Sequence, residues 1–131
     1  MRVLVLIKAS PESEAGLPPP ELLVAAMHRY NQALTDAGVL LAAEGLQASS
    51  RGCRVRVEGS HHQVIDGPFT ESKELIAGFW LWQVRSLEEA IEWVRRCPNP
   101  LGQSHQVEIR PVFEGLDCAA PQAAVPASTR Q

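Results

Sequence analysis

Features that mark several common functional classes are missing from this sequence of 131 residues. It has no basic excess, because the net charge is -3 and the pI about 5.8, so direct binding to nucleic acid is disfavoured. The longest strongly apolar run near the start, Val3 to Ile7, is too short for a signal peptide or a membrane span. The three cysteines form an odd set without CxxC spacing, which argues against a disulfide framework or a zinc site and fits a reducing cytoplasm. We expect a soluble cytoplasmic protein with no metal, cofactor, membrane or nucleic-acid partner.

The length and the hydrophobic fraction of 45% fit one domain with an adequate core. From Gly115 onward the chain is rich in Ala, Pro, Gln and Ser and has no aromatic residue. Such a segment cannot bury enough apolar surface to fold. We therefore expect a domain at residues 1–114 and a disordered tail at residues 115–131.

Apolar and alternating runs predict the strands of this domain. They are expected at Arg2–Lys8, Val39–Leu46, Arg51–Glu58, His61–Ile65, Ile76–Val84 and His105–Phe113. The turn at Gly59-Ser60 predicts that the third and fourth of these pair as a hairpin.

Two amphipathic helices are expected between the strands. The first spans Glu21–Ala37, follows the proline-rich lead-in Ser10–Pro20, and repeats apolar residues every three or four positions. The second opens with a capping box of Ser86 and Glu89. Its predicted apolar face consists of Leu87, Ala90, Ile91 and Val94. The order β-α-β-(β-β)-β-α-β predicts a ferredoxin-like α+β fold with an antiparallel sheet and an added hairpin.

The strand Ile76–Val84 is apolar on both faces. Phe79 and Leu81 point one way, and Trp80 and Trp82 point the other. Two helices cover only one face of such a sheet, so we expect the second face to meet the sheet of a twofold partner. The alternative is a monomer in which Trp80 and Trp82 lie partly under the loop Ser10–Pro20.

The segment from Val64 to Gly78 holds the densest cluster of unusual residues. Asp66 starts an Asp-Gly-Pro turn, where an aspartate commonly caps backbone amides. In the functional interpretation, Asp66 and Glu71 instead lie at the mouth of a cleft and act as acid, base or ligand.

This segment resembles the signature of the YCII-related superfamily, in its DGPF-domain branch. The match includes Asp66-Gly67-Pro68-Phe69, then Glu71, Lys73-Glu74, Gly78 and Trp80, with further matches spread over residues 1–114. The resemblance implies a ferredoxin-like dimer of the dimeric α+β barrel type. The wider superfamily resembles small enzymes in which a His–Asp pair lines a pocket, one of them a dehydrochlorinase of a chlorinated hydroxyquinol. An association of the DGPF branch with extracytoplasmic-function sigma factors in transcription initiation is also implied.

The candidate catalytic residues are therefore Asp66 and Glu71, with His28 a weaker third. Aligning Leu40-Leu41 with the family strand puts Met27, not His28, at the family histidine, and His28 falls on the polar side of its helix. Glu44 either faces the pocket or pairs with Arg110, because a buried carboxylate needs a partner. The candidate substrate-binding residues are Glu44, Lys73, Trp80, Trp82 and Arg110.

Three hypotheses about function follow from these assignments. The first is a small-molecule-binding or enzymatic homodimer with an acidic pocket between its two sheets, where desolvated carboxylates transfer protons on a small aromatic or oxygenated substrate. The alternative is a regulatory protein that works with a sigma factor through protein contacts. A family member retained only as a structural dimer is the third hypothesis.

Overall fold

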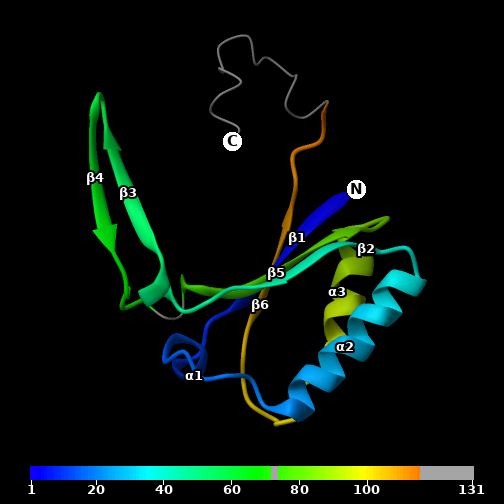
Figure 1. Cartoon of the computed structure of the whole chain (residues 1–131). Helices are drawn as coiled ribbons and strands as arrows, with labels where there is room; N and C mark the ends of the chain where they lie inside the picture. The colour runs from blue at the N-terminus through cyan, green and yellow to red at the C-terminus, as the bar shows by residue number, and fades with distance from the viewer. Residues whose placement is uncertain (72–73, 116–131) are drawn as a thin grey trace.

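A four-stranded antiparallel sheet with two helices on one face forms the body of the protein (Figure 1). The computed structural model describes residues 1–71 and 74–115. The strands are β1 (Arg2–Lys8), β2 (Leu40–Gly45), β5 (Ile76–Gln83) and β6 (Val107–Pro111), in the order β2-β5-β1-β6. Helix α2 (Glu21–Asp36) connects β1 to β2, and helix α3 (Leu87–Arg95) connects β5 to β6. Each helix therefore joins parallel strands that enclose an antiparallel one, and the predicted ferredoxin-like fold is confirmed.

A separate two-stranded sheet carries the predicted hairpin, which is also confirmed. It consists of β3 (Cys53–Glu58) and β4 (His61–Asp66), joined at Gly59, whose φ of 58° suits a tight hairpin turn. Two short elements were not expected from the sequence: helix α1 (Pro11–Glu14) within the proline-rich lead-in, and the 3-10 helix η1 (Ser49–Arg51) before the hairpin. The tail expected from residue 115 onward lies, apart from Gly115, outside the described residues.

The core lies between the sheet and the two helices. It is built from large apolar side chains of both layers, including Val3, Val5, Leu34, Trp80, Trp82 and Trp93. Trp80 packs edge-on against Tyr30, with ring centroids 5.6 Å apart, and its Nε1 donates a hydrogen bond of 2.7 Å to the Oδ1 of Asn31.

The alternative in which Trp80 and Trp82 lie partly under the loop Ser10–Pro20 is wrong. Their side chains are 2% and 0% exposed and belong to the helix-covered core. Because β5 is apolar on both faces, alternation tells which residues share a face but not which face receives the helices. Tyr30 and Asn31 of α2 provide the aromatic and hydrogen-bonding partners that select the tryptophan face.

The apolar face predicted for α3 is partly wrong. Ala90 is buried and Val94 half-buried, but Leu87 and Ile91 are exposed and Trp93 is buried in their place. Burying the largest apolar side chain gains the most, so the helix turns Trp93 toward Tyr30. Across the described ranges, no helix is long and apolar enough to cross a membrane.

Candidate functional site

The sheet face opposite the helices has an apolar centre and charged edges; we call it the open face. In the two central strands, Leu6 lies opposite Phe79 and Leu4 opposite Leu81, and all four are half-buried. The edge strands add charged residues in the same cross-strand rows, with Glu44 opposite Phe79 and with Glu108 and Arg110 opposite the two leucines. Cross-strand neighbours share one side of a sheet, so these groups form a single surface.

The charges on the open face are largely paired. The Oε1 of Glu108 lies 2.8 Å from the Nζ of Lys8, and its Oε2 lies 3.0 Å from an Nη of Arg110. Hydrogen bonds from Lys8 and Arg110 lower the pKa of the Glu108 carboxyl. Glu44 lies on β2, separated from β6 by the two strands β5 and β1, and is exposed. Of the two alternatives for Glu44, the pair with Arg110 is therefore not formed, because Arg110 is paired with Glu108.

The Asp-Gly-Pro-Phe turn docks on the segment that precedes the hairpin. The N–H of Gly67 donates to the carbonyl of Gly52 at 3.1 Å, and the Gly67–Pro68 peptide is cis. A Cβ atom at position 67 would lie 1.9 Å from the carbonyl oxygen of Ser49. The turn therefore accepts only glycine at this position without a backbone shift.

Ser49 connects this turn to α1. Its Oγ accepts a hydrogen bond of 3.0 Å from the N–H of Phe69 and donates one to the carboxylate of Glu14. The other oxygen of that carboxylate accepts from the N–H of Ser49 at 3.0 Å. Glu14, Ser49, Gly52, Gly67 and Phe69 thus form one bonded group, which we call the DGPF cradle.

A broad cavity of about 860 Å³, wide open to solvent, lies beside the DGPF cradle. The guanidinium of Arg54 stacks on the ring of Phe69, with its central carbon 3.7 Å from the ring centroid. The cavity's other charged side chains are Glu14, Arg51 and Glu74, and the chain from Gly45 to Ser49 completes one wall. The site offers an aromatic ring and charges of both signs, which suits a small ligand with an anionic or polar group.

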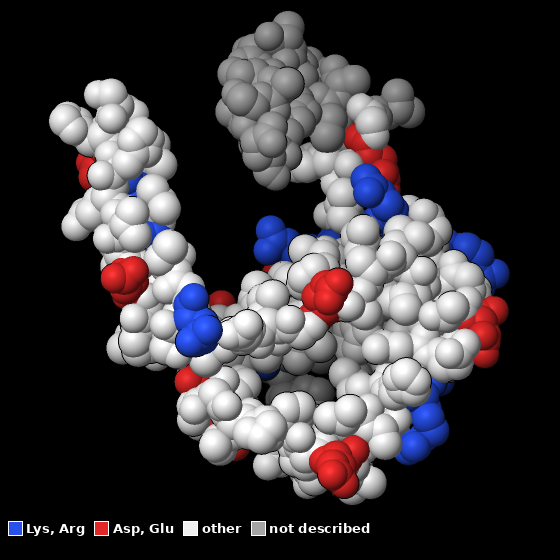
Figure 2. Space-filling model, viewed as in Figure 1, with Lys and Arg blue, Asp and Glu red and all other residues white. Residues whose placement is uncertain are grey.

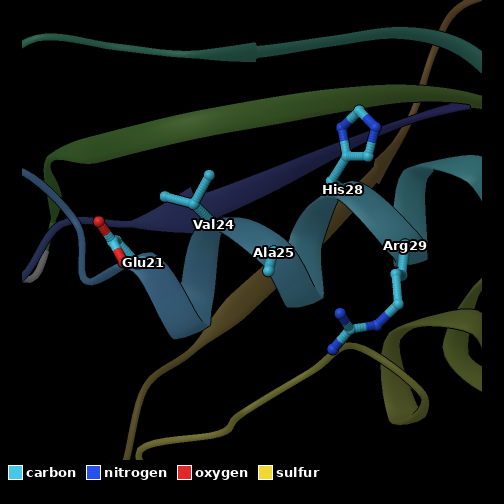
Figure 3. Close-up of a pocket in the computed structure, with 5 residues that line it drawn as sticks. All are labelled: Glu21, Val24, Ala25, His28 and Arg29. Atoms are coloured by element: carbon cyan, nitrogen blue, oxygen red, sulfur yellow. The ribbon is translucent and has the colours of Figure 1, made fainter.

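The predicted catalytic residues take three different places. Asp66 is the last residue of β4, adjacent to Gly67, and Glu71 follows the turn; both are exposed, and neither lines this cavity. His28 lies on the outer side of α2, where it borders a shallow depression of about 440 Å³ with Glu21, Val24, Ala25 and Arg29 (Figure 3). Lys73 lies outside the described residues.

The predicted binding residues separate into two groups. Glu44 and Arg110 lie on the open face, whereas Trp80 and Trp82 belong to the core on the other side of the sheet. The two tryptophans therefore do not share a surface with Glu44 and Arg110, and the aromatic residue opposite Glu44 on the open face is Phe79.

The residues that build the DGPF cradle and its cavity were not all found from the sequence. Glu14 and Ser49 are 35 positions apart, and neither stands in a pattern that indicates the contact. Arg54 stands in the alternating pattern of β3, which does not indicate that its guanidinium stacks on Phe69. Among the residues described, no group of three or more His, Cys, Asp or Glu side chains could hold a metal ion.

Three similarities to known proteins bear on this chain. A family model of the YCII-related domain matches residues 1–114. An uncharacterized protein of Rhizobium meliloti (strain 1021) is 32% identical over 77 residues, an alignment that covers 59% of this chain and 62% of that protein. The match therefore spans less than two thirds of the relative's length. A solved structure, 5-chloro-2-hydroxyhydroquinone dehydrochlorinase from Burkholderia phenoliruptrix AC1100 in complex with 2,5-dihydroxybenzoquinone, gives a TM-score of 0.48 at 13% identity, over 88% of this chain and 97% of that chain.

Proposed function

This chain belongs to the YCII-related family, and we propose that it is a homodimer of the DGPF branch that binds a small molecule. The observation that carries the ligand-binding part is the cavity of about 860 Å³ beside the DGPF cradle. Its volume lies within the range of about 300–1,000 Å³ that small-molecule sites occupy.

The homodimer is supported by the open face. Leu4, Leu6, Phe79 and Leu81 form an apolar strip along the centre of a sheet whose other face is already covered by helices. A second copy, with its own open face turned toward the first, covers the strips of both chains at once. Light scattering on the purified chain tests this arrangement, with twice 14.3 kDa as the expected mass. A mass of one chain at every concentration would exclude it.

The ligand we propose is a small aromatic acid. Arg51 and Arg54 supply guanidinium groups, which pair well with carboxylates, and the ring of Phe69 offers an aromatic surface beside them. The open face suits such a ligand less well, because Lys8 and Arg110 already neutralise Glu108 there. We therefore place the ligand beside the cradle instead of in an acidic pocket between the two sheets.

Proton transfer, where the bound molecule is also a substrate, is assigned to Asp66 and Glu71. Asp66 directly precedes Gly67 of the cradle, and Glu71 is two residues after Phe69, so both border the turn that forms part of the cavity wall. An exposed carboxylate close to a bound ligand can accept or donate a proton once the ligand is held within reach. The variants Asp66→Asn and Glu71→Gln test the assignment against any turnover; unchanged rates in both would contradict it.

Ligand binding is tested by calorimetric titration with 4-hydroxybenzoate as the probe. The variant Arg54→Ala removes a cavity guanidinium and is expected to weaken binding about tenfold, as for loss of one charge-assisted hydrogen bond. The matched control is Arg56→Ala, because Arg56 lies on the same face of the hairpin but pairs with Glu58 at 3.0 Å outside the cavity. Equal affinities of the Arg54→Ala variant and the unmodified chain, or no saturable binding at millimolar probe, would contradict the proposal.

The association with an extracytoplasmic-function sigma factor is the alternative proposal. The net charge of -3 suits contact with a basic protein surface. Capture of a purified sigma factor of this class by the immobilised chain would support it, and no capture at micromolar concentrations would count against it.

A further inference from the structure

The hairpin of β3 and β4, residues 53–66, has an apolar face that no other part of the described chain covers; we call this hairpin the arm. The register places Cys53 opposite Asp66, Val55 opposite Val64 and Val57 opposite His62 on one face. The exposed fractions of the three valines are 53% for Val55, 62% for Val57 and 63% for Val64. The other face is polar, with the side chains of Arg54, Arg56, Glu58, His61 and Gln63, apart from Ile65.

A hairpin of this kind needs a surface to pack on. Two-stranded hairpins alone are marginally stable in water, and every residue of β3 and β4 is exposed. The three valines share one face and both arginines lie on the other, which is typical of a strand pair with one covered face; Asp66 and His62 also lie on the valine face, at its two ends. The valine face therefore points to an interaction surface and not to a solvated loop.

The base of the arm is fixed by the DGPF cradle. The N–H of Gly67 bonds the carbonyl of Gly52 across the base, and Phe69 is held both by Ser49 and by the guanidinium of Arg54. These contacts bind the two ends of the arm to the body. The arm therefore leaves the body in a defined direction.

That direction leads into the space in front of the open face. The arm rises from one end of the sheet, away from the side that α2 and α3 cover (Figure 1), and a wide gap separates it from the body (Figure 2). Six residues at about 3.3 Å each give the arm a length of about 20 Å, whereas packed sheets lie about 10 Å apart. A second copy stacked on the open face therefore lies beside the arm, and the arm extends past that copy's sheet.

The area of the open face also favours a second copy of the chain that is held by the arm as well as by the sheet. Four strands at about 4.8 Å spacing and six residues long present a plan area of about 400 Å². Stable complexes bury about 800 Å² on each partner. The sheets alone therefore give a small interface, and two arms, each presenting a further plan area of about 200 Å², bring it closer to the standard size.

We propose that the arm of each protomer packs its valine face on the second copy and so clasps the dimer. The inference rests on the proposed homodimer, because the arm has this partner only where two open faces meet. By twofold symmetry the contact occurs twice, so a change on the valine face weakens two identical contacts in each dimer. The polar face, with Arg56 and Gln63, stays toward solvent.

The test compares two neighbouring residues of β4 that lie on opposite faces of the arm. Val64→Asp places a carboxylate on the valine face, and Gln63→Asp places the same group on the polar face. Sedimentation equilibrium over a dilution series gives the dimer dissociation constant of the full chain and of each variant. We expect Val64→Asp to raise it at least tenfold and Gln63→Asp to change it less than threefold. Val57→Ala, which adds no charge, is expected to raise it severalfold. Unchanged near-UV circular dichroism verifies that each variant keeps its core, because the arm contributes nothing to that core.

The sedimentation experiment distinguishes a wrong role for the arm from a wrong homodimer. A full chain that sediments as a monomer at every concentration overturns both. A stable dimer whose dissociation constant is the same in Val64→Asp and Gln63→Asp keeps the homodimer and overturns the role of the arm. Slower hydrogen exchange of the arm amides at dimer-forming concentrations than in dilute protein would support the clasp directly.

Discussion

Gly67 packs so closely on Ser49 that a Cβ atom added to the glycine would lie 1.9 Å from the serine's carbonyl oxygen. The contact is between backbone atoms, so neither partner can rotate away. It gives a physical reason for the glycine in the Asp-Gly-Pro-Phe turn: the turn and η1 are pressed together, and the arm grows from that junction.

Gly67→Ala should therefore lower the melting temperature sharply. Overpacking costs about 1–3 kcal/mol when the surroundings must shift, which corresponds to a fall of roughly 4 °C or more for a domain of this size. Gly45→Ala is the control, because nothing lies within 4 Å of a Cβ at position 45 and the residue has no positive φ. Calorimetric melting curves of the two variants should differ clearly; equal curves would mean that the close approach is not maintained in solution.

Ser49→Ala should weaken the junction by a different route. The substitution removes the Oγ that accepts from Phe69 and donates to Glu14, so an amide and a carboxylate lose a partner. Loss of such a partly buried polar group costs about 1–3 kcal/mol in the free energy of unfolding. Ser50→Ala, at the exposed neighbouring position, should cost less than about 0.5 kcal/mol. Urea unfolding of both variants measures the difference, and similar midpoints would rule out a stabilising role for the Ser49 hydroxyl.

The two tryptophans of β5 should respond unequally to replacement by phenylalanine. Trp80→Phe loses the hydrogen bond from Nε1 to Asn31, whereas the buried Nε1 of Trp82 has no hydrogen-bond partner among the described residues. Both variants lose similar apolar contact. We expect Trp80→Phe to be the more destabilising by about 1–3 kcal/mol in the free energy of unfolding, since Trp82→Phe also removes an unpaired buried donor. Chemical denaturation decides the order, and a larger loss for Trp82→Phe would reverse the interpretation.

Glu108 should stabilise the fold in a pH-dependent manner. Lys8 and Arg110 lower the pKa of its carboxyl below the ordinary 4.5, so the folded chain holds this proton less tightly than the unfolded chain. The contribution is present above about pH 4.5 and is lost as the pH falls through the lower folded value. The unfolding free energies of the native chain and of Glu108→Gln should therefore differ at pH 7 and converge at acidic pH. Glu44→Gln, on the opposite edge of the open face, controls for removal of a carboxylate.

The strands and their order could be predicted because their signal is local. Alternation, short apolar runs and the Gly59 turn are properties of a few consecutive residues, and they identified every strand of the two sheets. The same signals did not tell which face of β5 meets the helices, because Trp80 and Phe79 are both apolar. That choice depends on Tyr30 and Asn31, about 50 residues earlier in the chain.

The site was less predictable for the same reason. Asp66, Gly67 and Phe69 stand in a recognisable motif, but their partners Ser49 and Glu14 are small or common residues in unpatterned segments. The pairing that would have linked Glu44 to Arg110 was excluded only when the strand order put β5 and β1 between them.

The positions of the tryptophans mean that intrinsic fluorescence reports on only one part of the protein. All three tryptophans, Trp80, Trp82 and Trp93, belong to the helix-covered core, and the arm has none. Their fluorescence therefore follows the melting of the core and changes little when the arm moves. An arm that detached before the core melted would leave the emission spectrum unchanged, so a fluorescence transition measures the stability of one layer of this molecule and not of the whole.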